Sequence, residues 1–278
     1  MSDSNSSFRE RLERSCQDKQ SRVVVGLDPR YDQLPEELRR LQPAEAIIAF
    51  NRALIDALAD VCVAVKPQAA FYELWGAAGF EALRLTVEHA RSRGLVTIVD
   101  AKRNDIGSTA EAYAHAFLAP DGPMKADALT VNGYLGGDGI QPFLEAARPH
   151  GGGVFVLVKT SNSSSGELQD RTLSSGETVF EAMARLVDRW DCEAVVGGTW
   201  PEQAQRARAL MPRATILVPG YGAQGASAED CLPNFRNDGT GAVVNNARGI
   251  IFAQPWPDGP RRAAETMRDE LNRALQHS

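Results

Sequence analysis

Asp100, Lys102 and Asp105 place two carboxylates around one ammonium in a short stretch of the chain. They follow the apolar run at residues 95–99, which is typical of a buried β-strand. Because side chains of a strand alternate between two faces, Asp100 and Lys102 should point the same way. Three charges leave one without an opposite partner, which is costly in a buried structural role. We therefore interpret this group as a site that handles a charged substrate.

Short β-like runs alternate with helical patterns along the whole chain, and no Pro/Gly/Ser-rich linker divides it. The predicted strands are Arg22–Leu27, Cys62–Lys66, Leu95–Asp100, Ala128–Val131, Val154–Lys159, Glu193–Val196, Thr215–Val218 and Ala242–Val244. The predicted helices are Pro43–Asp60, Phe80–Arg93, Thr109–Phe117, Ile140–Arg148, Val179–Trp190, Pro201–Met211, a short one near Ala226–Cys231 and one near Pro260–Gln276. This order predicts one α/β domain over residues 1–278, a (β/α)₈ barrel, with a flexible tail at residues 1–7.

Polar residues follow the predicted strands where each one ends. In a (β/α)₈ barrel these ends form the reactive mouth, so the polar residues should meet at one rim. They are Asp28, Lys66, Asp100, Lys102, Thr130, Asn132, the segment 159–162, the loop 219–225 and the segment 245–248.

The segment from Gly220 to Gly225 matches the dinucleotide-binding pattern G-x-G-x-x-G. That pattern opens the first βαβ unit of its domain, whereas seven predicted strands precede it here. In (β/α)₈ barrels the loops after the last two strands often bind phosphate, and glycines let backbone N–H groups approach an anion. Gln224 could add an amide donor and Arg248 a bidentate guanidinium contact. The alternative is a glycine-rich turn beside a surface arginine.

Composition excludes several classes. The 278 residues are 43% hydrophobic and 24% charged, which is an ordinary globular balance. No uninterrupted apolar run reaches the length of a membrane span, and the polar start lacks the core of a secretory signal. The net charge of −6 argues against a nucleic-acid surface. Four scattered cysteines without metal-like spacing favour packing roles in a reduced, cytoplasmic compartment.

Taken together, the motifs closely resemble those of the orotidine 5′-monophosphate decarboxylase family, from about Arg22 to Ala253. They match best the longer, bacterial-type branch, whose signature is Asp-Ala-Lys-Arg-x-Asp-Ile-Gly. The residues that carry the resemblance are Asp28, Lys66, the segment 100–109, the loop 218–225 and Asn246-x-Arg248-Gly249. The resemblance implies decarboxylation of orotidine 5′-monophosphate to UMP, the last step of de novo UMP biosynthesis. It also implies a homodimer with shared active sites that uses neither cofactor nor metal.

The resemblance further implies catalytic roles. Lys102 resembles the lysine that faces C6 of the pyrimidine and later protonates it. Asp100 resembles the carboxylate beside the substrate carboxylate. Asp105 resembles the aspartate that completes the charged array of the neighbouring subunit's site. Lys66 belongs to the same array and, with Asp28, resembles the groups that hold the ribose hydroxyls.

The remaining implied contacts concern substrate binding. Ile106 and Thr109 match residues that cross the dimer interface with Asp105. Ser161 resembles the serine that contacts the pyrimidine ring, and Gln224 and Arg248 resemble the phosphate ligands. Pro219 and Gly249 complete the expected substrate-binding set.

Two positions depart from the family pattern, because Gly133 and Ser163 stand where prolines are usual. Both changes loosen the backbone, which concerns loop order rather than the charged residues. Whether the segment 161–166 acts as a mobile lid stays open at this point.

Structural roles compete with these assignments. Lys66 could be a structural lysine, Asp28 could cap a turn, Asp105 could be a helix N-cap, and Thr109 could serve only in packing.

Two other functions are weighed beside the decarboxylase. One is a sugar-phosphate lyase of the same barrel superfamily that uses an Asp-x-Lys-x-x-Asp pattern around Mg²⁺. The other is a non-catalytic nucleotide-binding barrel.

Overall fold

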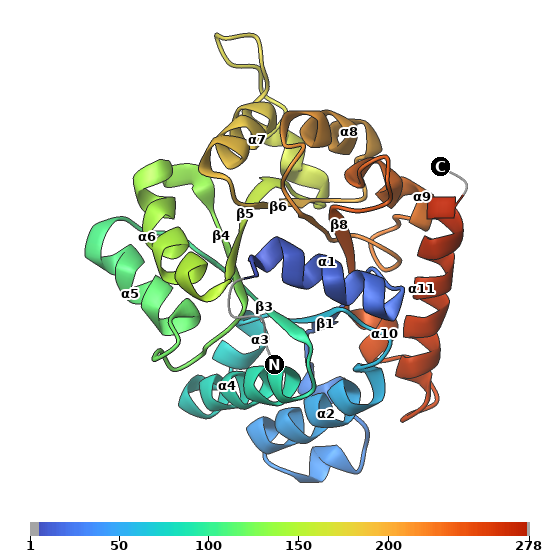
Figure 1. Ribbon diagram of the computed structural model, residues 1–278. Coiled ribbons are helices and arrows are strands. Elements are labelled where there is room, and N and C mark those ends of the chain that lie inside the picture. Colours follow the sequence, from blue (N-terminus) through green and yellow to red (C-terminus); the bar gives the residue numbers. More distant parts are fainter. Residues whose placement is uncertain (1–5, 277–278) are drawn as a thin grey trace.

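Eight parallel strands close into a barrel in which each strand pairs with its neighbours in chain order and β1 pairs with β8. The computed structural model describes residues 6–276, and Figure 1 shows the barrel surrounded by its helices. This confirms the predicted (β/α)₈ architecture. The strands are β1 (Val23–Leu27), β2 (Ala64–Pro67), β3 (Val96–Arg103), β4 (Ala128–Val131), β5 (Gly153–Lys159), β6 (Glu193–Val196), β7 (Ile216–Val218) and β8 (Ala242–Asn246).

Helices follow the strands around the outside of the barrel (Figure 1). The α-helices are α1 (Phe8–Lys19), α2 (Pro43–Leu58), α3 (Ala70–Glu73), α4 (Gly76–Ser92), α5 (Gly107–Leu118), α6 (Gly137–Ala147), α7 (Val179–Trp190), α8 (Pro201–Leu210), α9 (Ala228–Cys231), α10 (Arg248–Ile251) and α11 (Gly259–Gln276). Two 3₁₀ helices lie near the site, η3 (Gly133–Leu135) and η5 (Ser163–Glu167). Predicted and observed bounds agree for β4, β6 and α7, whereas β3 continues to Arg103 beyond its predicted end at Asp100.

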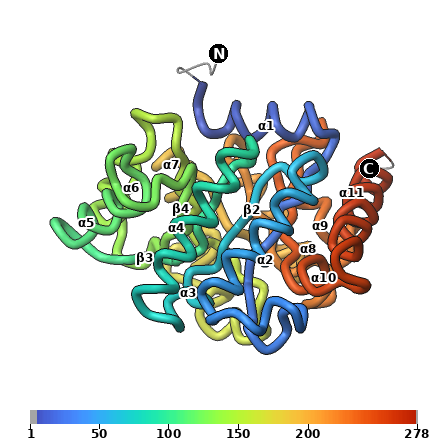
Figure 2. The backbone as a smooth tube through the Cα atoms, turned by 90° about the horizontal axis from the view of Figure 1, so that it is seen from below, coloured from blue at the N-terminus to red at the C-terminus, as the bar shows by residue number. Residues whose placement is uncertain are grey.

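Helix α1 was not predicted, although its start carries a recognisable signal. Ser7 Oγ accepts a bond from Glu10 N–H, and the Glu10 carboxylate accepts one from Ser7 N–H, which together form a capping box. Phe8, Leu12 and Cys16 recur every four residues and are all buried. Figures 1 and 2 show α1 lying across one end of the barrel. Of the predicted tail, residues 1–5 lie outside the described residues, while Ser7 is the N-cap of α1.

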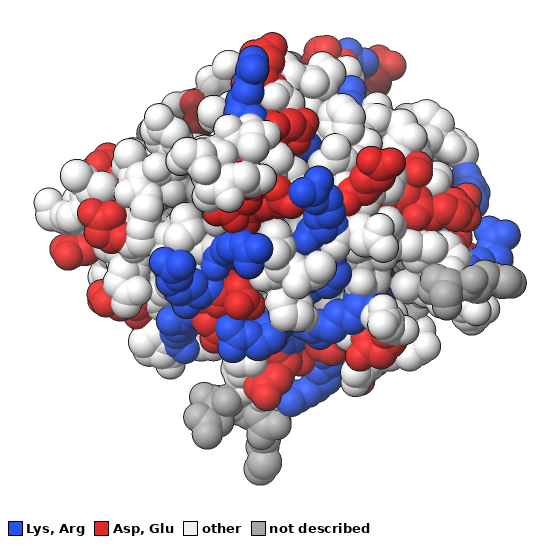
Figure 3. All heavy atoms as spheres, turned by 90° about the horizontal axis from the view of Figure 1, so that it is seen from above, with Lys and Arg blue, Asp and Glu red and all other residues white. Residues whose placement is uncertain are grey.

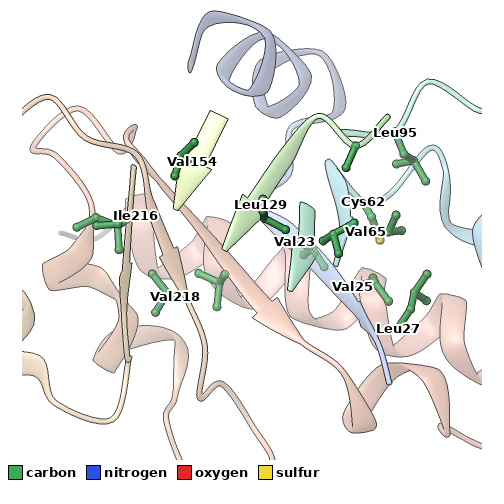
Figure 4. Packing of buried hydrophobic residues seen from close by; sticks show 14 of the residues in the cluster. Val23, Val25, Leu27, Cys62, Val65, Leu95, Leu129, Val154, Ile216 and Val218 are labelled. Atoms are coloured by element: carbon green, nitrogen blue, oxygen red, sulfur yellow. The ribbon is translucent and has the colours of Figure 1, made fainter. Parts of the chain in front are cut away.

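The strands are buried on both faces, which explains why they read as continuous apolar runs. Side chains such as Val23, Val25 and Leu27 point outward and pack beneath the helices (Figure 4). Val24 of the same strand points inward to a second cluster that fills the barrel and includes Phe8 of α1. The Phe8 ring meets Phe155 edge-on with centroids 5.6 Å apart, so α1 seals this end by apolar packing.

The end of the chain packs against the barrel rather than extending outward. Helix α11 contacts α2, α9, α10 and β1, and it occupies the place of the eighth barrel helix. The four cysteines are unpaired and buried, as their predicted packing role requires. Between residues 6 and 276, no helix combines the length and the apolar character needed to cross a membrane.

Basic and acidic side chains lie beside one another on the face shown in Figure 3. Helices α7 and α8, which lie on this side of the molecule, carry ion pairs such as Arg185–Glu177 at 3.1 Å and Arg206–Glu181. Arg185 and Arg206 therefore each have an acidic partner close by.

Phe8→Ala should lower the free energy of unfolding by about 3–5 kcal/mol, because it opens a cavity beneath α1. Urea unfolding followed by circular dichroism measures this change. Phe8→Leu keeps most of the volume and should cost clearly less. An unchanged urea midpoint for Phe8→Ala would show that α1 does not stabilise the barrel.

Candidate active site

A cavity of about 530 Å³ opens at the carboxyl ends of the strands, where the polar residues were predicted to meet. It lies at the end of the barrel opposite α1 and receives side chains from most of the strands. Four of the predicted rim residues are not part of the lining: Asn132, Lys159, Gly222 and Gly225. The lining includes eight of the predicted site residues: Asp28, Lys66, Asp100, Lys102, Ser161, Pro219, Gln224 and Arg248.

The Asp100 carboxylate is the best-coordinated group in this cavity. Its Oδ2 lies 2.7 Å from Lys66 Nζ and accepts a hydrogen bond of 2.9 Å from Gln68 Nε2. Its Oδ1 lies 2.6 Å from Lys102 Nζ and accepts a bond of 2.8 Å from Thr130 Oγ1. A carboxylate has about four acceptor positions, so the four donors saturate it. Asp100 is thus held in one orientation between two ammonium groups.

Lys102 reaches Asp100 by a route that strand alternation alone does not describe. Its φ is +46°, in the left-handed region that side chains other than glycine rarely adopt. The pairing of β3 with β4 shifts register between Val99 and Arg103, so Lys102 lies in a bulge. The prediction that Asp100 and Lys102 share a face is confirmed, but the bulge produces the contact.

Electrostatics keep Lys66 and Asp100 charged despite burial. Burial by itself lowers the pKa of Lys66, but attraction to Asp100 and Asp28 outweighs it and leaves that pKa raised. Burial likewise raises the pKa of Asp100, but Lys66 and Lys102 together hold it well below its usual range. Asp100 therefore stays anionic near neutral pH and does not itself accept a proton.

Asp28 lies beside this array but has a different environment. Its Oδ1 is buried and has no hydrogen-bond partner. Burial raises the pKa of Asp28, and the attraction of Lys66 offsets this only in part. A buried acceptor without a partner is costly in the folded protein. Asp28 Oδ1 therefore forms no turn-capping hydrogen bond and remains free to accept one at the cavity wall.

The glycine loop after β7 folds back on itself. Gly220, Gly222 and Gly225 have φ values of +111°, +67° and +95°, where residues with a side chain are disfavoured. Gly222 N–H donates to Ala226 O at 2.9 Å, which closes the loop. Gln224 of this loop and Arg248, at the start of α10, both line the cavity. A flexed loop with an amide and a guanidinium on one wall is suited to bind an anion.

The loop after β5 is anchored by Lys159, which is fully buried and is not part of the cavity lining. Lys159 Nζ lies 2.8 Å from Asp170 Oδ1 and 3.0 Å from Ser165 Oγ, and it stands over the Trp200 ring at 5.1 Å. Ser163, which replaces the usual proline, begins η5. These contacts hold the segment that brings Ser161 to the cavity wall.

Gly133, the other replaced proline, is buried at the start of η3. A Cβ at this position would lie 2.8 Å from Met183 Sδ and 3.0 Å from Val156 Cγ1. Packing against α7 therefore favours glycine here, in addition to any effect on chain flexibility.

Four predicted site residues lie outside the cavity lining: Asp105, Ile106, Thr109 and Gly249. The Asp105 carboxylate accepts a 2.8 Å bond from Ile106 N–H. The N-cap of α5 is Ile106, and no side chain caps this helix. The alternative that Asp105 is the helix N-cap is therefore wrong. Gly249 N–H donates to Asn246 Oδ1 at 3.2 Å. Ile106 is 53% exposed and Thr109 is also exposed.

Sequence reasoning missed several lining residues. Gln68 follows Lys66 by two residues and donates to Asp100, which the alternation of β2 could have indicated. Asn245 and Asn246 end β8; Asn246 was named in the family motif without a role, and Asn245 only as part of the segment 245–248. Phe71 and Arg30 carried no pattern that distinguished them, although Arg30 stands over the Phe71 ring at 5.8 Å. Other lining residues that were not singled out are Thr160, Asn162, Tyr221 and Ala247.

Within residues 6–276, no group of three or more His, Cys, Asp or Glu side chains lies together as a metal ion would require. The carboxylate lone pairs of Asp100 are already occupied by nitrogen and hydroxyl donors.

The comparisons with known proteins all point to one family. A family model described as orotidine 5′-phosphate decarboxylase / HUMPS family matches residues 21–266. The orotidine 5′-phosphate decarboxylase of Rhodopirellula baltica is 44% identical over an alignment that covers 90% of this chain and 93% of its own length. The solved Leishmania donovani OMP decarboxylase has a TM-score of 0.83 and 33% identity, covering 98% of this chain and 100% of its own. The Leishmania donovani UMP synthase structure has a TM-score of 0.85 and 35% identity, and the alignment covers 98% of this chain but 57% of that longer one.

Asp28→Asn should raise the free energy of unfolding, and the gain should grow with pH. A carboxyl whose folded pKa is raised stabilises the folded state below its unfolded pKa, near about 3.9, and loses that contribution as pH rises through the folded value. The amide has no charge to bury, so the free energy of unfolding of Asp28→Asn should exceed that of wild type by more at pH 8 than at pH 4. Urea unfolding at both pH values measures it.

The exposed Asp18→Asn serves as the matched control and should change stability little. If the stability advantage of Asp28→Asn over wild type shrinks as pH rises, burial does not raise the pKa of Asp28.

Proposed function

This chain belongs to the orotidine 5′-phosphate decarboxylase / HUMPS family, and from that membership we propose that Lys66, Asp100 and Lys102 carry its chemistry. The reaction is the decarboxylation of orotidine 5′-monophosphate to UMP in pyrimidine biosynthesis. The difficulty of this reaction is the carbanion left at C6 of the ring when CO₂ departs.

One observation carries the proposal: an ammonium lies in the cavity 2.6 Å from a buried carboxylate that a second ammonium also holds. The C6–carboxyl bond breaks, its electron pair stays on C6, and CO₂ leaves. The Lys102 ammonium stabilises the negative charge at C6 and then donates its proton there. The resulting neutral amine regains a proton from solvent, which closes the cycle.

Magnitudes limit what Lys102 can supply alone. A charge pair at about 4 Å with an effective dielectric near 20 is worth roughly 4 kcal/mol. This corresponds to about three powers of ten in rate. Binding energy from the distant phosphate must therefore contribute by closing and desolvating the site.

Asp100 serves as a fixed anion beside the substrate carboxylate. Its low pKa, caused by Lys66 and Lys102 against the effect of burial, prevents it from relaxing by protonation. Repulsion between the two carboxylates then weakens as the substrate loses CO₂. The same two ammonium groups offset this repulsion enough for the substrate to bind.

The other lining residues suit the remaining parts of the substrate. Asp28, whose Oδ1 has no partner, accepts from one ribose hydroxyl, and the Lys66 ammonium donates to a ribose oxygen. Ser161 contacts the pyrimidine, and Gln224 and Arg248 bind the phosphate beside Pro219 of the glycine loop. Gly249 keeps the backbone after Arg248 close to Asn246, where a Cβ would lie 2.8 Å from the Asn246 amide.

A homodimer with shared sites accounts for the predicted residues that lie off the cavity. Asp105, Ile106 and Thr109 are accessible at the start of α5. The neighbouring Tyr134 and Leu135 are 76% and 43% exposed and add large apolar side chains to the surface around Ile106. Gly139 brings α6 against this region, because a Cβ there would lie 2.9 Å from Asp105 O. A second copy that covers this surface would receive Asp105 in its own cavity.

Two alternatives are less consistent with the geometry. A Mg²⁺-dependent sugar-phosphate lyase needs free carboxylate lone pairs, whereas both oxygens of Asp100 are saturated. A barrel that only binds nucleotides would not need Lys102 held against Asp100 in a disfavoured backbone conformation.

We also propose that the reaction uses no cofactor. We further propose that the protein works in the cytoplasm, and the four unpaired, buried cysteines support this location.

Purified protein should consume orotidine 5′-monophosphate in the presence of EDTA, followed by ultraviolet absorbance. Lys102→Ala should lower kcat by at least about 10³-fold, because it removes the proton donor and the charge pair. Lys125→Ala is a matched control, since Lys125 is exposed, lies outside the cavity and has a similar φ of +53°. Substrate left unconsumed by wild type in EDTA would exclude the proposed reaction.

Mixing Lys102→Ala with Asp105→Ala subunits should restore activity that neither variant has alone. A mixed dimer with shared sites contains one site free of both substitutions. Random reassortment then restores on the order of a quarter of the wild-type sites. Mixed dimers confirmed by mass spectrometry that show no recovery would count against the shared site.

A further inference from the structure

Thr130 lies where the two halves of the charged array meet, although the sequence distinguishes it only as one of several polar residues at the strand ends. We propose that Thr130 is a positioning residue that fixes Lys102 against Asp100. This inference rests on the proposed roles of these two residues. Thr130 is 1% exposed, belongs to β4 and contributes to the cavity wall.

The bulge in β3 creates the need for such a residue. The register advances from Val99 to Arg103 on β3 while it advances only from Leu129 to Val131 on β4. The extra residues between them leave the regular ladder and lose its hydrogen bonds. Lys102, at φ +46°, is among them. A lysine persists in this conformation only where its surroundings determine it.

The Thr130 hydroxyl supplies the missing interaction, and its direction follows from chemistry. Lys102 N–H lies 3.0 Å from Thr130 Oγ1 and can only donate, so the hydroxyl oxygen accepts. Asp100 Oδ1 lies 2.8 Å from the same oxygen, and the ionised carboxylate can only accept. The single hydroxyl proton must therefore point to Asp100. The Thr130 hydroxyl thus connects the Lys102 backbone to the Asp100 carboxylate, which the Lys102 ammonium also contacts.

Three bonds then form a closed triangle of constraints. Thr130 holds the Lys102 backbone, Thr130 holds Asp100 Oδ1, and Lys102 Nζ lies 2.6 Å from that oxygen. The β-branched Thr130 side chain is restricted about χ1, so the hydroxyl is itself fixed by β4. The ammonium therefore has a defined place relative to the ring of a bound substrate.

This arrangement separates positioning from binding. The only proton of the Thr130 hydroxyl is engaged by Asp100, so it is not available to the substrate. Loss of the hydroxyl should displace Lys102 and slow the chemical step, while the groups that hold ribose and phosphate stay in place. The expected signature is a fall in kcat with little change in KM.

Thr130→Val removes the hydroxyl while keeping the shape of the side chain. We expect kcat for orotidine 5′-monophosphate to fall about 10²-fold, the cost of displacing a reacting group by about 1 Å, with KM within about threefold. Thr130→Ser restores the hydroxyl and should keep kcat within about tenfold of wild type. Should Thr130→Val fail to fold, Thr130→Ser and Thr130→Ala make the same comparison, because they differ by one hydroxyl oxygen.

Thr97→Val is the matched control. Thr97 is a buried threonine of β3 whose hydroxyl donates to Asp127 Oδ2 at 2.8 Å, and it lies outside the cavity. It should lose stability without losing kcat. Retention of kcat in Thr130→Val, or an equal loss in Thr97→Val, would overturn the positioning role. Wild-type protein that does not consume the substrate would instead refute the proposed function.

Discussion

Two ammonium groups on one buried carboxylate set the electrostatics of the cavity. Lys66 and Lys102 each approach a different oxygen of Asp100, and neutral donors from Gln68 and Thr130 complete the set. Burial would favour neutral side chains, but mutual attraction raises the pKa of Lys66 and lowers that of Asp100. Lys66 and Asp100 therefore stay charged although both are buried.

Stability and chemistry make opposite demands on this end of the barrel. Asp28 keeps a buried oxygen without a partner, and Lys102 keeps a disfavoured backbone conformation. Both features cost stability in the empty protein. At the other end, α1 seals the barrel through Phe8 and Phe155, a contact of purely apolar character. The fold thus concentrates strain at the site and stabilising packing away from it.

The site also combines residues on paired strands with residues on loops. The charged array lies on β2, β3 and β4, which are tied into a closed sheet. The proposed phosphate contacts lie on the glycine loop, where the backbone adopts left-handed turns, and at the start of α10. Lys159 anchors the wall that carries Ser161 from beneath, through Asp170 and Ser165. Precise placement is thereby greatest where the proposed proton transfer takes place.

The amino-acid sequence determined the barrel, because apolar runs and helical patterns can be recognised within short segments of the chain. It also determined which charged residues follow the strands, because residue type and order are properties of the same short segments. Only the tertiary structure decided how Lys102 meets Asp100, since a register shift depends on pairing with β4. The bonds from Gln68 and Thr130 to Asp100 arise for the same reason: side-chain alternation can place each residue on the cavity face, but strand pairing decides which group it meets there. Asp105 lies away from the cavity because the chain turns outward before α5. Local chemistry can be read along the chain, whereas contacts between distant segments exist only once the barrel closes.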